Sequence, residues 1–336
     1  MRIFVDAMGG DYAPGAAVEG AAEALRVLPE LQVTLAGVEK AMRPYLDKEK
    51  VKQVQDRIKV VETPEVISNH DAPVIAIRQK KGSGIVMGML AVKEKEADGF
   101  VSAGSTGAVL AGGMFRLGRV TGIERPALAP LMPNGKGYFL LIDCGANVDC
   151  QPEWLDQFGL MGSVYMQKVM GIGDPRVGLV NIGAEAEKGN ALVKGTYPIM
   201  EQAAYNFVGN VEARDITADH ADVIVCDGFS GNLILKFMEG VAGTLMHIIK
   251  KELLSDLRGK IGGMISKPAF RRVAKLMDYA EVGGAPLLGV NGVVVKAHGS
   301  SNAHAMACAI KQAALMAEGR VPELIGRQIE SGVTKV

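Results

Sequence analysis

The sequence predicts a three-layer α/β/α protein, in which a mostly parallel β-sheet lies between helices. Two observations lead to this fold class. Short apolar runs of strand length alternate with longer runs of helical periodicity over almost the whole chain. The chain has 42 glycines and only 5% aromatic residues, which suits many strand-to-helix turns. No low-complexity linker interrupts the alternation, so we expect a single α/β domain over residues 1–336, with two lobes as the alternative.

The predicted strands are short apolar runs that often end in Gly, Asp or Ser. They are expected at 2–7, 32–37, 58–61, 98–103, 127–131, 137–142, 176–181, 207–211, 223–226 and 293–296. The step Asn134-Gly135 separates two of these runs and favours an antiparallel hairpin within the otherwise parallel sheet. Residues 283–292 are rich in Gly and Pro and are expected to form a loop.

The predicted helices carry apolar residues at helical spacing, and several begin with Pro or a polar capping residue. They are expected at 16–28, within 39–56, and at 73–81, 85–96 and 152–170. Further helices are expected to end at 117, to begin after 190 and to end near 253, and two more follow residue 301. Residues 254–278 form an amphipathic segment that is expected to protrude as a helical hairpin broken at Pro268.

Composition and charge exclude several classes of protein. The formal net charge is zero, which argues against a nucleic-acid binder that relies on general positive charge. The scattered cysteines form no C-x-x-C pair, as is typical of reduced thiols in the cytosol. The N-terminal apolar run is too short for a signal peptide, and we find no run of about 18 apolar residues. We therefore expect a soluble cytoplasmic protein.

Three strand-to-helix junctions share one pattern: an apolar strand, a turn of small and polar residues, and then a helix. They lie at 98–109, 222–239 and 293–305. Such turns present backbone N–H groups at the positive end of a helix dipole, where anions bind. Because ligands of open α/β sheets bind at the carboxyl ends of the strands, we expect one shared anion pocket. The alternative is that these polar residues only cap helices and the glycines only permit turns.

Several side chains could contact an anion in this pocket. The hydroxyl and amide candidates are Ser105, Thr106, Ser230, Asn232, Ser300 and Ser301. His298 lies at the end of a predicted strand, between Lys296 and Gly299, although a lone histidine is more often structural. Lys188, Arg78 and Lys81 are the cations that the sequence places best, unless they are only solvated. No His/Cys/Asp spacing indicates a metal site, and no P-loop or dinucleotide fingerprint is present.

The segment 254–278 combines bulky apolar residues with clustered positive charge. Its cations are Arg258, Lys260, Lys267, Arg271, Arg272 and Lys275, against the single acid Asp256. Leu257, Ile261 and Ile265 belong to one apolar set. This pattern favours a helix pair that lies on an anionic membrane. A hairpin that packs against a partner subunit is the alternative, and the two interpretations are compatible.

Eight short motifs, taken together, resemble one family from end to end. They are VDAMGGD at 5–11, SAGSTGA at 102–108, DCGANVD at 143–149, VGLVNIG at 177–183, KGN at 188–190, GNVEARD at 209–215, DGFSGN at 227–232 and KAHGSS at 296–301. On these motifs the chain resembles the PlsX family of phosphate acyltransferases of bacterial phospholipid synthesis. The resemblance implies a fold akin to phosphotransacetylases and to isocitrate and isopropylmalate dehydrogenases.

The resemblance also implies a reaction and its partners. A long-chain acyl group would pass from acyl carrier protein to inorganic phosphate, without a cofactor. The protein would be a homodimer in peripheral contact with the membrane, where a glycerol-3-phosphate acyltransferase uses the acyl phosphate. Phosphate is itself a nucleophile, so the protein needs only to bind an anion beside a thioester and stabilise the developing oxyanion.

Candidate site residues come from the matched motifs, from the segment 254–278 and from the placement of exposed cations. Lys188, His298 and Asn232 would be catalytic. Phosphate or substrate would bind Gly104, Ser105, Thr106, Gly107, Asn147, Asp227, Gly228, Ser230, Gly231 and Ser300. Membrane or carrier-protein contact would fall to Leu257, Ile261, Ile265, Arg271, Arg272 and Lys275, with Arg78 and Lys81 as further candidates for docking an acidic carrier. The alternatives are a phosphate acetyl- or butyryltransferase that uses coenzyme A and a non-catalytic membrane-associated scaffold.

Overall fold

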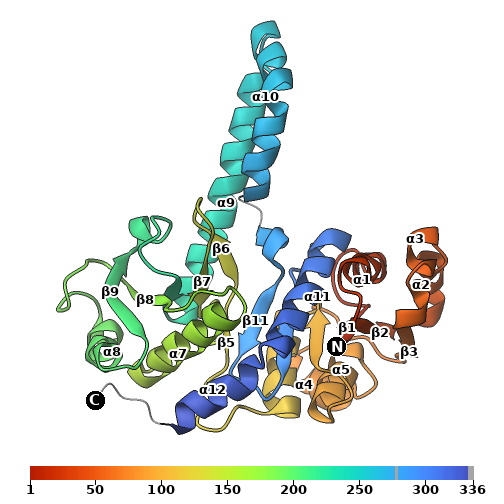
Figure 1. Ribbon diagram of the computed structural model, residues 1–336, viewed down its shortest axis with the longest axis horizontal. Helices are drawn as coiled ribbons and strands as arrows, with labels where there is room; N and C mark the ends of the chain where they lie inside the picture. The colour runs from red at the N-terminus through yellow and green to blue at the C-terminus, as the bar shows by residue number, and fades with distance from the viewer. Residues whose placement is uncertain (277–278, 332–336) are drawn as a thin grey trace.

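The computed structural model describes residues 1–276 and 279–331 and divides the strands between two sheets (Figure 1). The seven-stranded sheet has the order β3 (Ile58–Glu62), β2 (Gln32–Gly37), β1 (Arg2–Asp6), β4 (Gly99–Ser102), β12 (Val293–Lys296), β11 (Ala285–Leu288) and β5 (Ala127–Leu128). The five-stranded sheet has the order β6 (Leu131–Pro133), β7 (Tyr138–Ile142), β10 (Val223–Val225), β8 (Arg176–Asn181) and β9 (Asn206–Glu212).

Helices cover both sheets (Figure 1). They are α1 (Gly15–Val27), α2 (Glu39–Leu46), α3 (Glu49–Lys52), α4 (Pro73–Gln79), α5 (Gly84–Lys93), α6 (Thr106–Gly112) with the π-turn Gly113–Leu117, α7 (Pro152–Lys168), α8 (Ala191–Glu201), α9 (Gly228–Leu253), α10 (Leu257–Leu276), α11 (Ala303–Glu318) and α12 (Val321–Glu330). Short 3-10 turns lie at Gln55–Arg57, Ala213–Asp215 and Tyr279–Val282. The mostly parallel α/β class predicted from the sequence is confirmed.

The pairing of strands follows the predicted pattern at most positions. Strands β1, β2, β3, β4 and β12 pair in parallel, as do β7, β8, β9 and β10. The hairpin across Asn134-Gly135 is confirmed, because β6 and β7 are antiparallel. The central strands β1, β4, β10 and β12 are buried almost throughout, as expected for parallel strands covered on both faces.

The predicted loop at 283–292 is wrong, because it contains the strand β11, which pairs antiparallel with β12 and β5. Pro286 cannot donate to a sheet, and its neighbour Gly284 reads as a turn residue, so the sequence pattern favoured a loop. In the structure the carbonyl of Pro286 accepts from the N–H of Ala129 at 3.0 Å. Gly284 passes so close to the backbone of Lys296 that only glycine fits there.

One buried apolar cluster contains residues from both sheets, so the two parts of the molecule share a core. Among its largest members is Tyr165 of α7, which is fully buried. Gln312 of α11 donates to the Tyr165 hydroxyl at 2.8 Å, which satisfies both polar groups and ties the helix of one sheet to a helix of the other. The pocket described below lies where these two halves meet.

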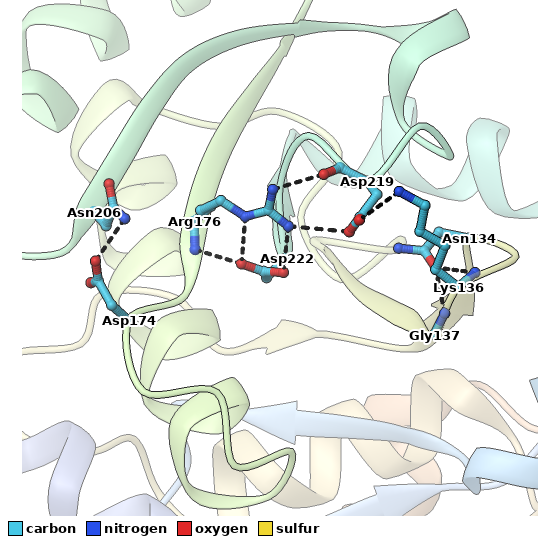
Figure 2. A network of polar contacts seen from close by, with 8 residues as sticks. All are labelled: Asn134, Lys136, Gly137, Asp174, Arg176, Asn206, Asp219 and Asp222. Carbon is cyan, nitrogen blue, oxygen red and sulfur yellow. Dashed lines mark hydrogen bonds and ion pairs between the residues drawn. The ribbon is translucent and has the colours of Figure 1, made fainter.

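An ionic network fixes the amino-terminal ends of the second sheet (Figure 2). The Arg176 guanidinium at the start of β8 donates to both carboxylate oxygens of Asp222, at 3.0 and 2.9 Å, and to Asp219. Lys136, in the β6–β7 turn, reaches the same Asp219 at 3.2 Å. A bidentate arginine contact is directional, so this network sets the register of β8 beside β10, whose other end leads into the pocket.

Helices α9 and α10 project far beyond the body as an antiparallel hairpin (Figure 1). The predicted break at Pro268 is wrong, because α10 runs without interruption from Leu257 to Leu276 and packs against α9. Within the described residues, α9 is also the one helix long and apolar enough to cross a membrane by length and composition, which the sequence analysis did not anticipate. Its first turns, however, form part of the body.

Candidate active site

A pocket of about 230 Å³ lies at the carboxyl ends of the strands, where the two sheets meet. Each of the three predicted junctions contributes to it. Thr106 comes from the turn after β4, Asn232 from the first turn of α9, and His298 from the turn after β12. The structure therefore brings together three turns that are widely separated in the sequence.

The lining of the pocket divides by chemistry. Segments β5, β6 and β7 and one turn of α9 supply an apolar set, made of Leu128, Pro130, Leu131, Met132, Cys144 and Leu235. The ends of β4 and β12 and the first turns of α9 supply the polar set, made of Thr106, Asn232, Lys236, Glu239, Lys296 and His298. Such a pocket suits a ligand that has an apolar part beside an anionic or carbonyl group.

Lys296 is the buried cation of the pocket and was not among the predicted site residues. It ends β12 and is only 7% exposed. Its ammonium donates to the backbone carbonyl of Ala103 at 3.4 Å and to that of Ala297. Burial lowers the pKa of Lys296 to about 8, although the negative charges of Asp6 and Asp11 oppose that change. The sequence signal was a lysine that ends an otherwise apolar buried strand, VVVK.

Asp6 and Ser102 lie beside Lys296 across neighbouring strands. Ser102 is the register partner of Asp6 on one side and of Lys296 on the other. The Ser102 hydroxyl donates to the Asp6 carboxylate at 2.8 Å, and the N–H of Met8 donates to the same carboxylate at 3.2 Å. Burial raises the pKa of Asp6, while these donors and the charge of Lys296 lower it. The Asp6 carboxylate is thus hydrogen-bonded by Ser102 and Met8 and not by Lys296.

His298 is held in one tautomer. The backbone N–H of Ser300 donates to its Nδ1 at 3.2 Å, so the proton of the neutral ring lies on Nε2. The Ser300 hydroxyl also contacts Nδ1, at 2.8 Å. Burial and the positive charge of Lys236 lower the pKa of His298, which leaves the imidazole neutral at pH 7. Ser300 thus orients His298, and its predicted role in binding phosphate stays a prediction.

Most residues of the α9 turn fit the capping alternative. Asp227 is the N-cap: its carboxylate accepts from the N–H of Ser230 at 2.8 Å and from the Ser230 hydroxyl at 2.9 Å. The N–H of Gly228 donates to the carbonyl of Asn147 at 2.7 Å. Gly231 packs directly on the carbonyl of Asp143. Of this turn, Asn232 is the predicted site residue that lines the pocket.

Asp143 organises the turn beneath α9 and joins the two sheets. Its carboxylate accepts from the N–H of Leu128 at 2.9 Å, which belongs to the other sheet, and from the N–H of Asn147 at 2.6 Å. The amide of Asn147 donates to the same carboxylate at 3.0 Å and to the carbonyl of Pro126. Burial raises the pKa of Asp143 to about 6, although these donors oppose that change. Asn147 thereby holds this turn, and its predicted role in substrate binding stays a prediction.

The turn after β4 gives a similar result. The N–H of Gly104 donates to the Ser102 hydroxyl at 2.9 Å. Ser105 caps α6 by accepting from the N–H of Ala108. Gly107 packs against Pro73 at the start of α4. Of the predicted residues in this turn, Thr106 lines the pocket.

Lys188 does not line this pocket in the part of the chain that the structure describes. Its ammonium pairs with Glu185 at 2.8 Å in the loop after β8, and the side chain is about half exposed. The hydrogen bond with Glu185 raises the pKa of Lys188. Asn181 holds the loop, since its amide donates to the carbonyl of Lys188 at 3.1 Å. The catalytic role of Lys188 stays a prediction.

The predicted membrane or carrier residues lie on α10. Leu257, Ile261 and Ile265 are exposed, at 73%, 50% and 75%. Arg271 and Arg272 are also exposed. The side chain of Lys275 lies outside the described part of the structure. Across the described residues, no cluster of His, Cys, Asp and Glu side chains could hold a metal ion.

Comparisons with known proteins agree along almost the full chain. The family described as "Fatty acid synthesis protein" matches residues 1–324. Proteins named phosphate acyltransferase from Alkaliphilus oremlandii and Clostridium tetani are 48% and 47% identical, and the match covers 98% and 96% of this chain and the same shares of theirs.

Two solved structures share the fold. A phosphotransacetylase from Streptococcus pyogenes has a TM-score of 0.61 and 18% identity, with 94% of each chain covered. A branched-chain phosphotransacylase from Enterococcus faecalis has a TM-score of 0.61 and 13% identity, with 94% of this chain and 99% of that chain covered. The predicted likeness to the phosphotransacetylase fold is confirmed.

Proposed function

The chain belongs to the family of phosphate acyltransferases, which are transferases, and we propose that it moves a long-chain fatty acyl group from acyl carrier protein to inorganic phosphate, giving acyl phosphate for phospholipid synthesis. The observation that carries this proposal is the pocket between the two sheets. Its apolar set suits the acyl chain next to the thioester, and its polar set suits phosphate and the thioester carbonyl.

The reaction needs no covalent intermediate on the protein. An oxygen of phosphate attacks the thioester carbonyl, the new C–O bond forms, and the C–S bond then breaks. Negative charge that develops on the carbonyl oxygen is stabilised by preorganised donors. The Nε2–H of neutral His298, the amide of Asn232 and the hydroxyl of Thr106 are the donors assigned to this task.

Acyl carrier protein is the donor in this proposal, and two exposed cations are candidates for docking it. Arg78 and Lys81 are exposed at the end of α4. Helix α4 packs against α6, whose first residue is Thr106 in the pocket. Pro73 at the start of α4 packs on Gly107, next to Thr106, and an acidic carrier docked on Arg78 and Lys81 at the end of this helix would present the thioester on a flexible arm.

The donor experiment tests the proposal directly. Purified protein is incubated with labelled phosphate and, in parallel, palmitoyl-carrier protein, acetyl-coenzyme A or butyryl-coenzyme A, and acyl phosphate is trapped with hydroxylamine. We expect acyl phosphate from the carrier-bound palmitoyl group. Product from the short coenzyme A thioesters alone would favour the phosphate acetyl- or butyryltransferase, and no product from any donor would favour the scaffold.

A homodimer and peripheral membrane contact belong to the same proposal. Exposed apolar side chains follow one another along α9 at helical spacing: Phe229, Leu233, Phe237, Val241, Leu245 and Ile248. A row of this kind on a protein surface favours burial against another surface. A second subunit covers the α9 row, and the tip of the hairpin contacts the bilayer, where a glycerol-3-phosphate acyltransferase uses the product.

We expect Leu257→Glu and Ile261→Glu each to weaken binding to anionic vesicles at least about tenfold, because burying such a side chain contributes about 1.5–3 kcal/mol. The measurement is co-sedimentation with vesicles that contain phosphatidylglycerol. Turnover of a soluble acyl donor should be retained, since both residues lie in the first turns of α10, which projects away from the body (Figure 1).

The matched control is Leu315→Glu, which adds the same charge at an exposed apolar residue of α11 in the body of the molecule. That variant should bind vesicles as the unsubstituted protein does. If the two α10 variants bind vesicles normally, the hairpin is not the membrane contact.

A further inference from the structure

The buried ammonium of Lys296 is not explained by the architecture of the sheet. Lysine is almost never fully buried without a paired charge, because removing an ammonium from water is unfavourable. Lys296 is only 7% exposed, yet among the described residues its ammonium has no direct ion pair. A structural role alone would be served as well by an apolar residue at the end of β12.

The hydrogen bonds of Lys296 leave one donor for a ligand. An ammonium has three N–H groups. The carbonyls of Ala103 and Ala297 accept two of them. Because Lys296 lines the pocket, the third is available to a bound anion. The two carbonyls also fix the side chain, so little freedom is lost when a ligand binds.

The charged groups around Lys296 partly compensate its charge. Asp6 of β1 and Asp11, in the following turn, are negative, and Lys236 of α9 is positive. Asp6 is held by Ser102 and Met8, while Lys236 pairs with Glu239 at 2.8 Å. The neutral ring of His298 also lines the pocket. The pocket thus holds a cation, and the nearby carboxylate of Asp6 is hydrogen-bonded by other groups.

We propose that Lys296 contacts the phosphate in this pocket and donates the proton that the departing thiolate takes up. This inference rests on the proposed function, whose cation had been expected at Lys188. One side chain thus supplies both the charge that binds phosphate and the acid that protonates the leaving group. It ends β12, and His298, which also lines the pocket, lies two residues further on.

The proton balance of this step is complete. The free N–H of the Lys296 ammonium first donates to hydrogen phosphate dianion, which attacks the carbonyl carbon so that the C–O bond forms. When the C–S bond breaks, the same N–H gives its proton to sulfur, and Lys296 becomes an amine. The amine then takes the proton that the phosphate brought. The products are acyl phosphate dianion and free thiol, and Lys296 is again an ammonium.

The acidity of Lys296 supports this role. Its lowered pKa of about 8 lies close to the usual value of a thiol, about 8.5. Proton transfer is most effective when the pKa of the acid matches the task. Only the protonated form can act, so kcat/KM should fall as the pH rises through about 8.

Two substitutions separate the two functions of Lys296. Lys296→Met removes both charge and proton, so we expect KM for phosphate to rise and kcat with palmitoyl-carrier protein to fall by about 10²–10⁴-fold. Lys296→Arg keeps a charge that does not lose its proton. It should recover much of the phosphate affinity but little of kcat, and it should lose the fall of activity above about pH 8.

A thioester with a more acidic thiol provides the decisive comparison. With the thiophenyl thioester of palmitate, the leaving thiolate needs no proton, so the kcat defect of both variants should shrink by at least tenfold. An equal loss with both thioesters, or normal KM for phosphate and normal kcat in Lys296→Met, would overturn the proposal. Should Lys296→Met fail to fold, as judged by its unfolding curve, Lys296→Arg alone still gives the leaving-group and pH results.

Phosphate binding without turnover distinguishes failure of this inference from failure of the proposed function. Broadening of the ³¹P resonance of inorganic phosphate reports binding to the full chain. Binding that weakens in Lys296→Met while no donor reacts would refute the acyl transfer but leave the anion site in place. Acyl transfer with phosphate binding unchanged in Lys296→Met would refute only the role of Lys296.

Discussion

Gly231→Ala should lower the free energy of unfolding by more than about 4 kcal/mol, the range of the most severe single substitutions. The added Cβ would overlap the carbonyl oxygen of Asp143 and lie 2.9 Å from the sulfur of Cys226. This carbonyl oxygen is a backbone atom of the turn that the hydrogen bonds of the Asp143 carboxylate hold in place. Helix α9 must therefore move away, taking Asn232 and Leu235 out of the pocket. Chemical unfolding measures the stability, and acyl phosphate formation measures the site.

Gly243→Ala is the matched control in the same helix, outside the exposed apolar row of α9. Nothing lies within 4 Å of the Cβ added at Gly243, so the substitution brings no clash. Alanine is favoured over glycine in a helix by about 1 kcal/mol, and this variant should be equally or more stable than the unsubstituted protein. If both variants had the same stability, the close packing of α9 on the Asp143 turn would not be what positions the site.

His298→Ala should lower kcat by about 10²–10³-fold, the usual loss when one donor to a developing oxyanion is removed. The reason is geometric: Ser300 fixes the ring with its proton on Nε2, and truncation removes that donor. Since the neutral ring is the active form, activity should also fall as the pH drops through the lowered pKa of His298. Steady-state kinetics with palmitoyl-carrier protein, between about pH 5 and 9, give both results.

Ser300→Ala is the control for His298. It removes the hydroxyl but keeps the backbone N–H that donates to Nδ1, so the tautomer is retained and kcat should change little. A normal kcat in His298→Ala would show that the imidazole takes no part in the reaction. A loss in Ser300→Ala as large as in His298→Ala would assign the role to the hydroxyl instead.

Much of the fold follows from local sequence pattern. Strands β2, β8 and β12 begin and end where their apolar runs do, because parallel strands buried on both faces leave continuous apolar runs in the sequence. The hairpin at Asn134-Gly135 follows from turn chemistry in the same way. Strand β11 was missed because Pro286 and its glycines match a loop, and only pairing with β12 and β5 reveals the strand.

The site was predicted less completely than the fold. The sequence identified the three turns, since strand-to-helix junctions have a local pattern. It could not tell which polar residues in them serve the fold. Asp227 and Ser230 satisfy helix ends, and Asn147 binds Asp143, whereas Thr106 and Asn232 line the pocket. Lys296 was overlooked because burial of its ammonium depends on neighbouring strands, which sequence spacing does not specify.

A structure of the protein with phosphate bound tests the central claim most directly. The account predicts phosphate in the pocket between the two sheets, with an oxygen about 2.7–3.1 Å from the Lys296 ammonium and with Thr106 and His298 beside it. Phosphate bound instead at Lys188 in the loop after β8, with the pocket empty of it, would contradict the account.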